Sequence, residues 1–419
     1  ESADLTRTAT MEELDDALRC PKTASSMGAD RLAYGYFKYA KEPREALLKV
    51  MNACLAAGDI PPAFKHARVL LLPKDPSKPD GDVRNHRPIS LLSCGLKSLE
   101  RILKKRMAEQ CEKHGLINGA QYGSREKRQT TQPLNLLLDL IENANRTGQP
   151  LHIASLDYRQ AFDSVPFRCV EDGLRRAGFS EKVVTMYSNM MKGRTCSFIT
   201  GYGDTDPIPV NSSVIQGSVL GPLLYLLALD GLLEKMNQFK GVTVPRTHGC
   251  KNFGTIAALQ YVDDTILLAE SKEELEAMVS KLQEIAKAMG MQLNQTKTVY
   301  AVAGVNEQRQ GPLQMQGGKS AEQMVEHGAF KYLGVHIATD GSWTKQEEVL
   351  TEKIEGYLSR LSLKSLRETQ AKTVVQSVIL PTILYAGAIA ALSDSWVTKM
   401  ETRILRAVKG ALKLRSGTS

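Results

Sequence analysis

Two short stretches of the chain place carboxylates directly after apolar runs that look like β-strands. In residues 259–269, Asp263 and Asp264 stand between an apolar run at 259–262 and another at 266–268. This pattern predicts a β-hairpin with acid at its tip. Two adjacent like charges repel, and a chain tolerates them in a solvated turn or around a divalent cation. For an isolated Asp-Asp pair, the solvated turn is the commoner explanation.

A second acidic position shifts the balance towards chemistry. Residues 151–156 are another strand-like stretch, and Asp157 ends it. Three carboxylates at the ends of neighbouring strands could share two Mg²⁺ ions, which prefer oxygen ligands and keep water or substrate phosphate as further ligands. Such a metal pair stabilises the attacking and leaving oxygens of an in-line phosphoryl displacement. The three aspartates therefore predict phosphoryl-transfer chemistry, with Mn²⁺ as the alternative metal.

The elements that must position these acids are short strands mixed with amphipathic helices. Thr10-Met11-Glu12-Glu13 is a capping box, which predicts a helix that ends near Arg19. A strand at 65–74 and a return arm at 83–90 predict another hairpin. Apolar residues at helical spacing predict helices at 91–113 and 130–145, and residues 345–414 have a helical, basic pattern that we expect Pro381 to interrupt.

Several motifs together resemble the polymerase region of a reverse transcriptase. Tyr-Val-Asp-Asp at 261–264, preceded by Leu-Asp-x-x-x-Ala-Phe-Asp at 156–163, resembles the palm of these enzymes. The segments 87–92, 216–222 and 332–334 most resemble the non-LTR (LINE-type) retrotransposon group. The resemblance implies an α+β right-hand polymerase with fingers, a palm whose antiparallel sheet carries the catalytic carboxylates and is backed by helices, and a helical thumb. The implied boundaries are 1–150 for the fingers with an N-terminal helical extension, 151–340 for the palm with fingers insertions near 165–210, and 341–419 for the thumb.

The resemblance also implies a role for each motif residue. Asp157, Asp263 and Asp264 would be the catalytic metal ligands, for two Mg²⁺ ions per site. The main-chain carbonyl of Tyr158 would add an oxygen ligand, and Lys297 would be the general acid that protonates the pyrophosphate leaving group. A loop lysine is more often simply solvated. The remaining implied roles are triphosphate binding by Lys74 and Arg87, nucleotide binding by Phe162, Gln216 and Gly217, and a primer grip at Tyr332, Leu333 and Gly334.

Phe162 is the residue on which sugar selectivity depends in this resemblance. It lies five residues after Asp157, where the family places a bulky ring beneath the C2′ position of the nucleotide sugar. Such a ring leaves little room for a 2′-OH, the group that distinguishes RNA precursors from DNA precursors. Deoxynucleotides are therefore the expected substrates. Without the neighbouring aspartate, Phe162 reads as an ordinary core aromatic.

The composition is that of an ordinary globular protein. The 419 residues are 42% hydrophobic and 24% charged, which is enough for a large core and several domains. Lys and Arg exceed Asp and Glu by 54 to 46, a balance compatible with a nucleic-acid partner. The seven cysteines form no Cys-x-x-Cys pair, which indicates reduced thiols. No apolar run reaches membrane-spanning length, and because the chain starts at Glu1 we expect a fragment of a longer protein.

The function expected from the resemblance is RNA-directed DNA synthesis on a primer 3′-OH, as part of a retrotransposon protein that uses target-primed synthesis. The expected partners are an RNA template, a DNA primer, their RNA–DNA hybrid and dNTPs, with no membrane; the oligomeric state is left open. The family resemblance implies an intracellular, nuclear location. Two alternatives stay open, namely a group II intron maturase type of protein and a domesticated, catalytically silent RNA-binding scaffold. Three retained, mutually repelling carboxylates disfavour the scaffold, and Phe162 disfavours an RNA-dependent RNA polymerase.

Overall fold

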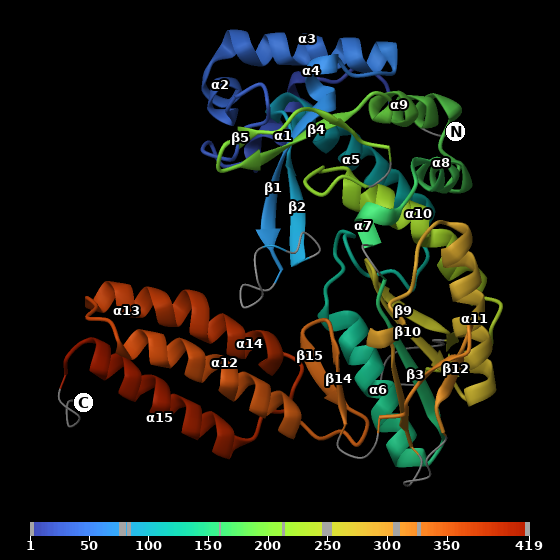
Figure 1. Ribbon diagram of the computed structural model, residues 1–419, viewed down its shortest axis with the longest axis vertical. Helices are drawn as coiled ribbons and strands as arrows, with labels where there is room; N and C mark the ends of the chain where they lie inside the picture. Colours follow the sequence, from blue (N-terminus) through green and yellow to red (C-terminus); the bar gives the residue numbers. More distant parts are fainter. Residues whose placement is uncertain are drawn as a thin grey trace. The chain divides into compact units, whose positions relative to one another are not determined.

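The computed structural model describes residues 4–74, 81, 85–158, 161–211, 214–244, 254–304, 311–324 and 328–414. The chain divides into two compact units (Figure 1). Unit 1 comprises Glu1–Lys127, Tyr158–Gln238 and Lys281–Asn294, and unit 2 comprises Arg128–Asp157, Phe239–Ser280 and Gln295–Ser419. The helix α11 (Lys272–Ala288) begins in unit 2 and ends in unit 1. The boundaries inferred above for fingers, palm and thumb remain a prediction.

The described part of unit 1 is mainly helical and contains a mixed sheet. The capping box predicted at its N-terminal helix is confirmed, since Thr10 and Glu13 bond each other's backbone and the helix ends at Arg19. Its helices are α1 (Met11–Arg19), α2 (Tyr34–Tyr39), α3 (Lys41–Ala57), α4 (Pro62–Lys65), α5 (Cys94–His114), α7 (Ala161–Ser164), α8 (Phe167–Arg176), α9 (Glu181–Met191) and α10 (Gly221–Met236). Its strands are β1 (His66–Pro73), β2 (His86–Leu91), β4 (Thr195–Thr200), β5 (Gly203–Asp204) and β6 (Ile208–Pro209).

The sheet of unit 1 confirms the predicted hairpin and adds a pairing that the sequence did not predict. β1 and β2 are antiparallel, with Leu72 opposite Arg87. β1 is also parallel to β4, with His66 opposite Thr195, and the strand order is β2-β1-β4-β5 with β6 on β4. The helix predicted from residue 91 begins later, at Cys94, because Leu91 still belongs to β2 and Ser93 caps the helix by accepting a bond from the Gly95 N–H.

Unit 2 contains a four-stranded antiparallel sheet, smaller hairpins and a helical C-terminal part. Its helices are α6 (Thr131–Thr147), the 3-10 turn η2 (Gln295–Lys297), α12 (Thr344–Ser362), α13 (Glu368–Val374), the π-helical segment η3 (Val375–Ile379), α14 (Leu380–Gly387) and α15 (Asp394–Ala411). Its strands are β3 (Leu151–Leu156), β7 (Val242–Thr243), β8 (Thr255–Ile256), β9 (Ala258–Tyr261), β10 (Asp264–Ala269), β11 (Val299–Ala303), β12 (Leu313–Met315), β13 (Lys319–Ala321), β14 (Ala329–Tyr332) and β15 (Val335–Ala338).

The four-stranded sheet has the order β11-β3-β10-β9, and α6 packs against it (Figure 1). Ile266, Leu267 and Leu268 of β10 are fully buried, so this strand is covered on both faces. A strand that is buried on both faces has apolar residues in succession, and residues 266–268 have this pattern. The predicted hairpin around Asp263 is confirmed, because β9 and β10 pair with Tyr261 opposite Asp264.

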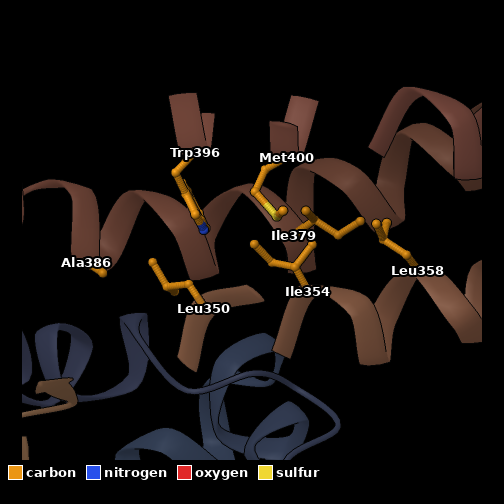
Figure 2. Close-up of a cluster of buried hydrophobic side chains, with 7 residues drawn as sticks. All are labelled: Leu350, Ile354, Leu358, Ile379, Ala386, Trp396 and Met400. Atoms are coloured by element: carbon orange, nitrogen blue, oxygen red, sulfur yellow. The ribbon is translucent and has the colours of Figure 1, made fainter. Parts of the chain in front are cut away.

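The C-terminal helices of unit 2 pack around a buried apolar cluster of their own. Figure 2 shows its side chains converging from α12, η3, α14 and α15. The indole N–H of Trp396 donates to the hydroxyl of Thr351 at 2.8 Å, so the polar end of this large ring is bonded inside the cluster. The members of the cluster are Leu350, Ile354, Leu358, Ile379, Ala386, Trp396 and Met400.

Pro381 does not interrupt the helical run as predicted. α13, η3 and α14 follow one another without a gap, and Pro381 lies in the first turn of α14. A proline lacks a backbone N–H and crowds the preceding turn, and a short π-helical segment relieves both problems by widening that turn. Among the described residues, no helix combines the length and the apolarity that crossing a membrane requires.

Within unit 1, α8 and α10 approach so closely that one residue must be glycine. A Cβ added at Gly173 of α8 would lie 2.4 Å from the carbonyl oxygen of Leu227 in α10. The same oxygen accepts a bond from Arg176 Nη2 at 2.7 Å. The main chain of α10 is therefore held directly against α8.

Gly173→Ala is expected to destabilise the protein by about 2 kcal/mol, because the added methyl overpacks the α8–α10 contact. Gly356→Ala is the matched control, since Gly356 is an exposed position in α12 with open space around it. This control should stabilise the helix by roughly 0.5–1 kcal/mol. Urea unfolding followed by circular dichroism measures both. Equal effects of the two substitutions would contradict the close approach.

Candidate active site

The sheet of unit 2 brings the three predicted carboxylates to one edge. β10 pairs antiparallel with β3, and Thr265 lies opposite Leu156. Asp264 and Asp157 are the next residues of the two strands in that register. Asp263 precedes Asp264 at the tip of the β9–β10 hairpin. Strand pairing, rather than any contact between the acids, therefore places them together.

The tip of this hairpin has a strained backbone. Tyr261 and Asp264 are paired, so Val262 and Asp263 form a two-residue turn. Val262 has a φ of 61°, although the first position of such a turn normally takes glycine when φ is positive. A β-branched residue in this region costs on the order of 1–3 kcal/mol and persists only where the surrounding structure imposes it. Here the two flanking strands impose it, and the strained residue directly precedes the acidic pair.

The three carboxylates act on one another electrostatically. Burial of the Asp264 carboxyl by the surrounding chain removes water from it and raises its pKa to about 6, and the charges of Asp263 and Asp157 add to this shift. Asp264 is exposed, so the charges of Asp263 and Asp157 act on its carboxylate through solvent as well as through protein. Burial also raises the pKa of Asp263, again with a contribution from Asp157. The edge therefore favours a bound cation, which would relieve this repulsion.

Two lysines of unit 2 lie near these acids. Lys297 Nζ is 3.2 Å from Asp157 Oδ2, and it comes at the end of η2, directly before β11 pairs with β3. Lys331 of β14 favours the charged form of Asp264, as Lys297 also does. Lys297 was predicted from the sequence, and Lys331 was not. The available signal was its position directly before Tyr332, the first residue of the proposed primer grip.

The chemistry of this donor set fits a divalent cation with a preference for oxygen. Carboxylates are the ligands that Mg²⁺ and Mn²⁺ take in proteins, and three crowded carboxylates provide the negative charge. Within the described segments, no three His, Cys, Asp or Glu side chains form a preformed metal cluster. Asp157 forms an ion pair with Lys297. The site therefore fits a divalent cation by its negative charge and its oxygen ligands. Tyr158, the predicted carbonyl ligand, belongs to unit 1, where it bridges to Leu293.

Unit 1 holds the predicted nucleotide-binding turn at 216–221 between two elements. The Ser90 N–H of β2 donates to the Gln216 carbonyl at 2.7 Å. Gly217 has a φ of 118°, and a Cβ there would lie 2.2 Å from the Ser90 carbonyl oxygen. On the other side, the Glu100 carboxylate of α5 accepts from the Val219 N–H at 2.8 Å. The turn is therefore fixed through its main chain, and position 217 requires glycine.

Glu100 and Arg194 are two buried side chains of opposite charge that act on each other and that were not predicted from the sequence. Burial raises the pKa of Glu100, and the charge of Arg194 opposes that shift. Arg194 is 3% exposed, and its Nε donates to the Met190 carbonyl at 3.0 Å. The signal in the sequence was an acid on the apolar stripe of α5, four residues after Leu96 and three before Leu103. An acid on such a stripe needs a buried partner.

The remaining predicted residues lie at a hairpin end, in the short helix α7 and in a turn. Arg87 is exposed on β2, and the Lys74 N–H donates to the Asn85 carbonyl at 2.6 Å, so both belong to the open end of the β1–β2 hairpin. Phe162 of α7 stacks on Tyr225 of α10. In unit 2, the turn between β14 and β15 contains Leu333 and Gly334, both with positive φ, and the Tyr385 hydroxyl donates to the Leu333 carbonyl at 2.5 Å.

Comparison with known proteins identifies relatives of this chain. The family model described as "Reverse transcriptase (RNA-dependent DNA polymerase)" matches residues 73–337. The "Retrovirus-related Pol polyprotein from type-1 retrotransposable element R2" of Nasonia vitripennis is 25% identical over 100% of this chain and 39% of its own length. The "RNA-directed DNA polymerase from mobile element jockey" of Drosophila melanogaster is 24% identical over 87% of this chain and 40% of its own length. The chain thus spans about two fifths of these relatives.

A solved structure of apo telomerase from Candida tropicalis, truncated from its C-terminal domain, aligns with a TM-score of 0.44 and 15% identity. It covers 63% of this chain and 56% of the telomerase chain. The family match and the mixture of helices and sheets confirm the predicted α+β right-hand polymerase class. The R2 and jockey relatives also support the resemblance to retrotransposon enzymes.

Asp264→Asn is expected to stabilise the metal-free protein at neutral pH and not at acidic pH. The pKa of this carboxyl rises from the ordinary 3.8 to about 6 on folding, so wild-type stability falls as pH rises through this window. Asn carries no proton to lose. The gain should reach about 1 kcal/mol near pH 7.5, after allowance for solvent exposure, and vanish near pH 4.

Urea unfolding in EDTA at a series of pH values measures this difference. The control is Asp206→Asn, the same chemical change at an exposed position between β5 and β6. The control should show no such pH dependence. A gain from Asp264→Asn that is the same at all pH values would mean that the raised pKa of Asp264 is not its cause.

Proposed function

This chain belongs to the reverse transcriptase (RNA-dependent DNA polymerase) family, and we propose that it copies RNA into DNA by adding dNTPs to a primer 3′-OH. The observation that carries the proposal is the edge of the unit 2 sheet, where pairing of β3 with β10 holds Asp157 beside Asp264. The R2 and jockey relatives are named after mobile elements, which supports the proposal that this chain acts as part of a retrotransposon protein. We propose target-primed synthesis on this basis.

The metal-binding role falls to Asp157, Asp263 and Asp264, with the Tyr158 carbonyl as a further oxygen. Two Mg²⁺ ions, or Mn²⁺ in their place, would supply activation of the primer hydroxyl and neutralisation of the triphosphate charge. Burial, together with the charges of Asp263 and Asp157, raises the pKa of Asp264, and this supports the role because a bound cation would offset both the lost hydration and the repulsion. The chain's own contribution is to keep these oxygens at one sheet edge.

Lys297 is proposed as the proton donor to the departing pyrophosphate. Its side chain is two-thirds exposed and its Nζ lies 3.2 Å from Asp157 Oδ2, so the amine is both close to the acidic edge and able to reach a ligand in solvent. An ammonium group in reach of the leaving oxygen can donate a proton to it as the P–O bond breaks. Lys331 adds positive charge beside Asp264.

The nucleotide-binding roles are proposed for residues of unit 1. Lys74 and Arg87, at the open end of the β1–β2 hairpin, would hold the triphosphate. Gln216 and Gly217 would contact the nucleotide and the template base from a turn fixed by Ser90 and Glu100. Phe162 would exclude a ribose 2′-OH.

The primer grip is proposed at Tyr332, Leu333 and Gly334 of unit 2. Both central residues of this turn have positive φ, and Tyr385 of α14 bonds the Leu333 carbonyl. A turn held in this way can present its backbone to a primer without rearranging. The basic C-terminal helices would contact the phosphates of the RNA–DNA hybrid. Nuclear residence is proposed from the family resemblance alone.

Primer extension on an RNA template with dNTPs and Mg²⁺ tests the function. Asp263→Asn is expected to lower extension at least about a hundredfold, because a metal ligand is lost, while RNA binding is retained. Asp206→Asn is the matched control and should extend normally. EDTA should abolish extension by the wild type. RNA binding without extension under either metal would favour the RNA-binding scaffold instead.

Lys297→Met is expected to lower the rate of single-nucleotide addition by about a hundredfold, the typical contribution of a general acid. Stability should change by less than about 1 kcal/mol, because the Lys297–Asp157 pair is exposed. Rapid quench under single-turnover conditions measures the rate, and Lys297→Arg separates charge from proton transfer. If Lys297→Met adds nucleotides as fast as the wild type, the proton comes from elsewhere.

A further inference from the structure

Phe162 is held at its backbone as well as at its ring. Its carbonyl oxygen accepts a hydrogen bond from the Val214 N–H at 2.8 Å. Its ring lies on that of Tyr225, with centroids 4.2 Å apart and an angle of 16° between the ring planes. Phe162 is half-buried, whereas Tyr225 is fully buried. Phe162 is therefore a partly accessible ring that rests on an inaccessible one.

Tyr225 is itself in a position that cannot move easily. It lies in α10, a helix with buried residues on every face, including the neighbours Leu224, Leu226 and Leu227. Two positions after Tyr225, the Leu227 carbonyl accepts from Arg176 and is in near contact with Gly173 of α8. Close-packed interiors have low compressibility, so a helix packed in this way resists displacement of its side chains. The ring of Tyr225 is therefore a rigid platform.

We infer that Tyr225 is a positioning residue for sugar selectivity, because it sets the height of the Phe162 ring and prevents the ring from receding. This inference rests on the proposed function and on the proposed role of Phe162. A ring that excludes a single hydroxyl group must stay in place, because a shift smaller than the diameter of that group would already make room for it. Stacked aromatic side chains attract each other beyond simple area burial, and a planar partner fixes both the height and the tilt of the ring.

The stacking geometry favours one of two ways in which the Phe162 ring could exclude ribose. A ring that only filled space would need no planar partner, and any apolar residue of similar volume at position 225 would serve. A ring held in one place by stacking depends on the aromatic plane of residue 225. The near-parallel geometry and the full burial of Tyr225 point to the second way.

The experiment compares the incorporation of a dNTP with that of the corresponding rNTP on an RNA template, as the ratio of kcat/KM values. Tyr225→Leu and Tyr225→Met remove the aromatic plane and keep an apolar side chain, and two variants guard against failure of one to fold. Tyr225→Phe is the matched control that keeps the plane. The expected result is a three- to tenfold fall in dNTP preference for Leu and Met and an unchanged preference for Phe.

A double-mutant cycle with Phe162→Ala supplies the second readout. Once the Phe162 ring is gone, Tyr225→Leu should cause no further fall in dNTP preference. A merely structural role would lower dNTP and rNTP incorporation together and leave their ratio unchanged, which would overturn the inference while the polymerase activity stands. A wild-type protein that extends no primer would instead overturn the proposed function.

Discussion

The repulsion among three carboxylates at one sheet edge is the constraint on which the rest of unit 2 depends. Like charges repel, so the side chains of these acids do not favour their own proximity. The three acids are Asp157, Asp263 and Asp264. The ladder between β3 and β10, together with the buried residues of β10, supplies the opposing free energy. Hydrophobic burial is the largest favourable contribution in such a sheet, so the core of unit 2 sustains a locally unfavourable charge arrangement.

Backbone strain accompanies charge at this edge. Val262 at the β9–β10 tip and Leu333 in the β14–β15 turn both adopt positive φ, a region that disfavours residues with a Cβ. Each lies in a two-residue turn between paired strands, which leave the chain no other path. Glycine would relieve the strain but would also loosen the turn. A strained residue in an imposed turn gives a backbone with one conformation, which suits a turn proposed to hold a ligand.

Unit 1 uses a different device, a buried charge bonded to main chain. Glu100 holds the turn at 216–221 through the Val219 N–H, and Arg194 offsets its charge. Removing an ion from water is costly, so this arrangement depends on the hydrogen bonds that the carboxylate accepts. The benefit is directional, since a carboxylate that bonds backbone N–H groups fixes where the turn lies. Stacking of Phe162 on Tyr225 extends the same principle to a ring.

By itself, the sequence determined what short-range rules govern. The capping box at Thr10, the hairpin around Asp263 and the apolar run of β10 each depend on residues a few positions apart. Motif order also predicted that Asp157, Asp263 and Asp264 lie at the ends of neighbouring strands, which the pairing of β3, β9 and β10 confirms. Only the tertiary structure decided the parallel pairing of β1 with β4, the contact of Glu100 with Val219 and the stack of Phe162 on Tyr225. These partners are far apart along the chain, and no local pattern selects among many compatible ones, because long-range contacts are chosen by the packing of the whole core.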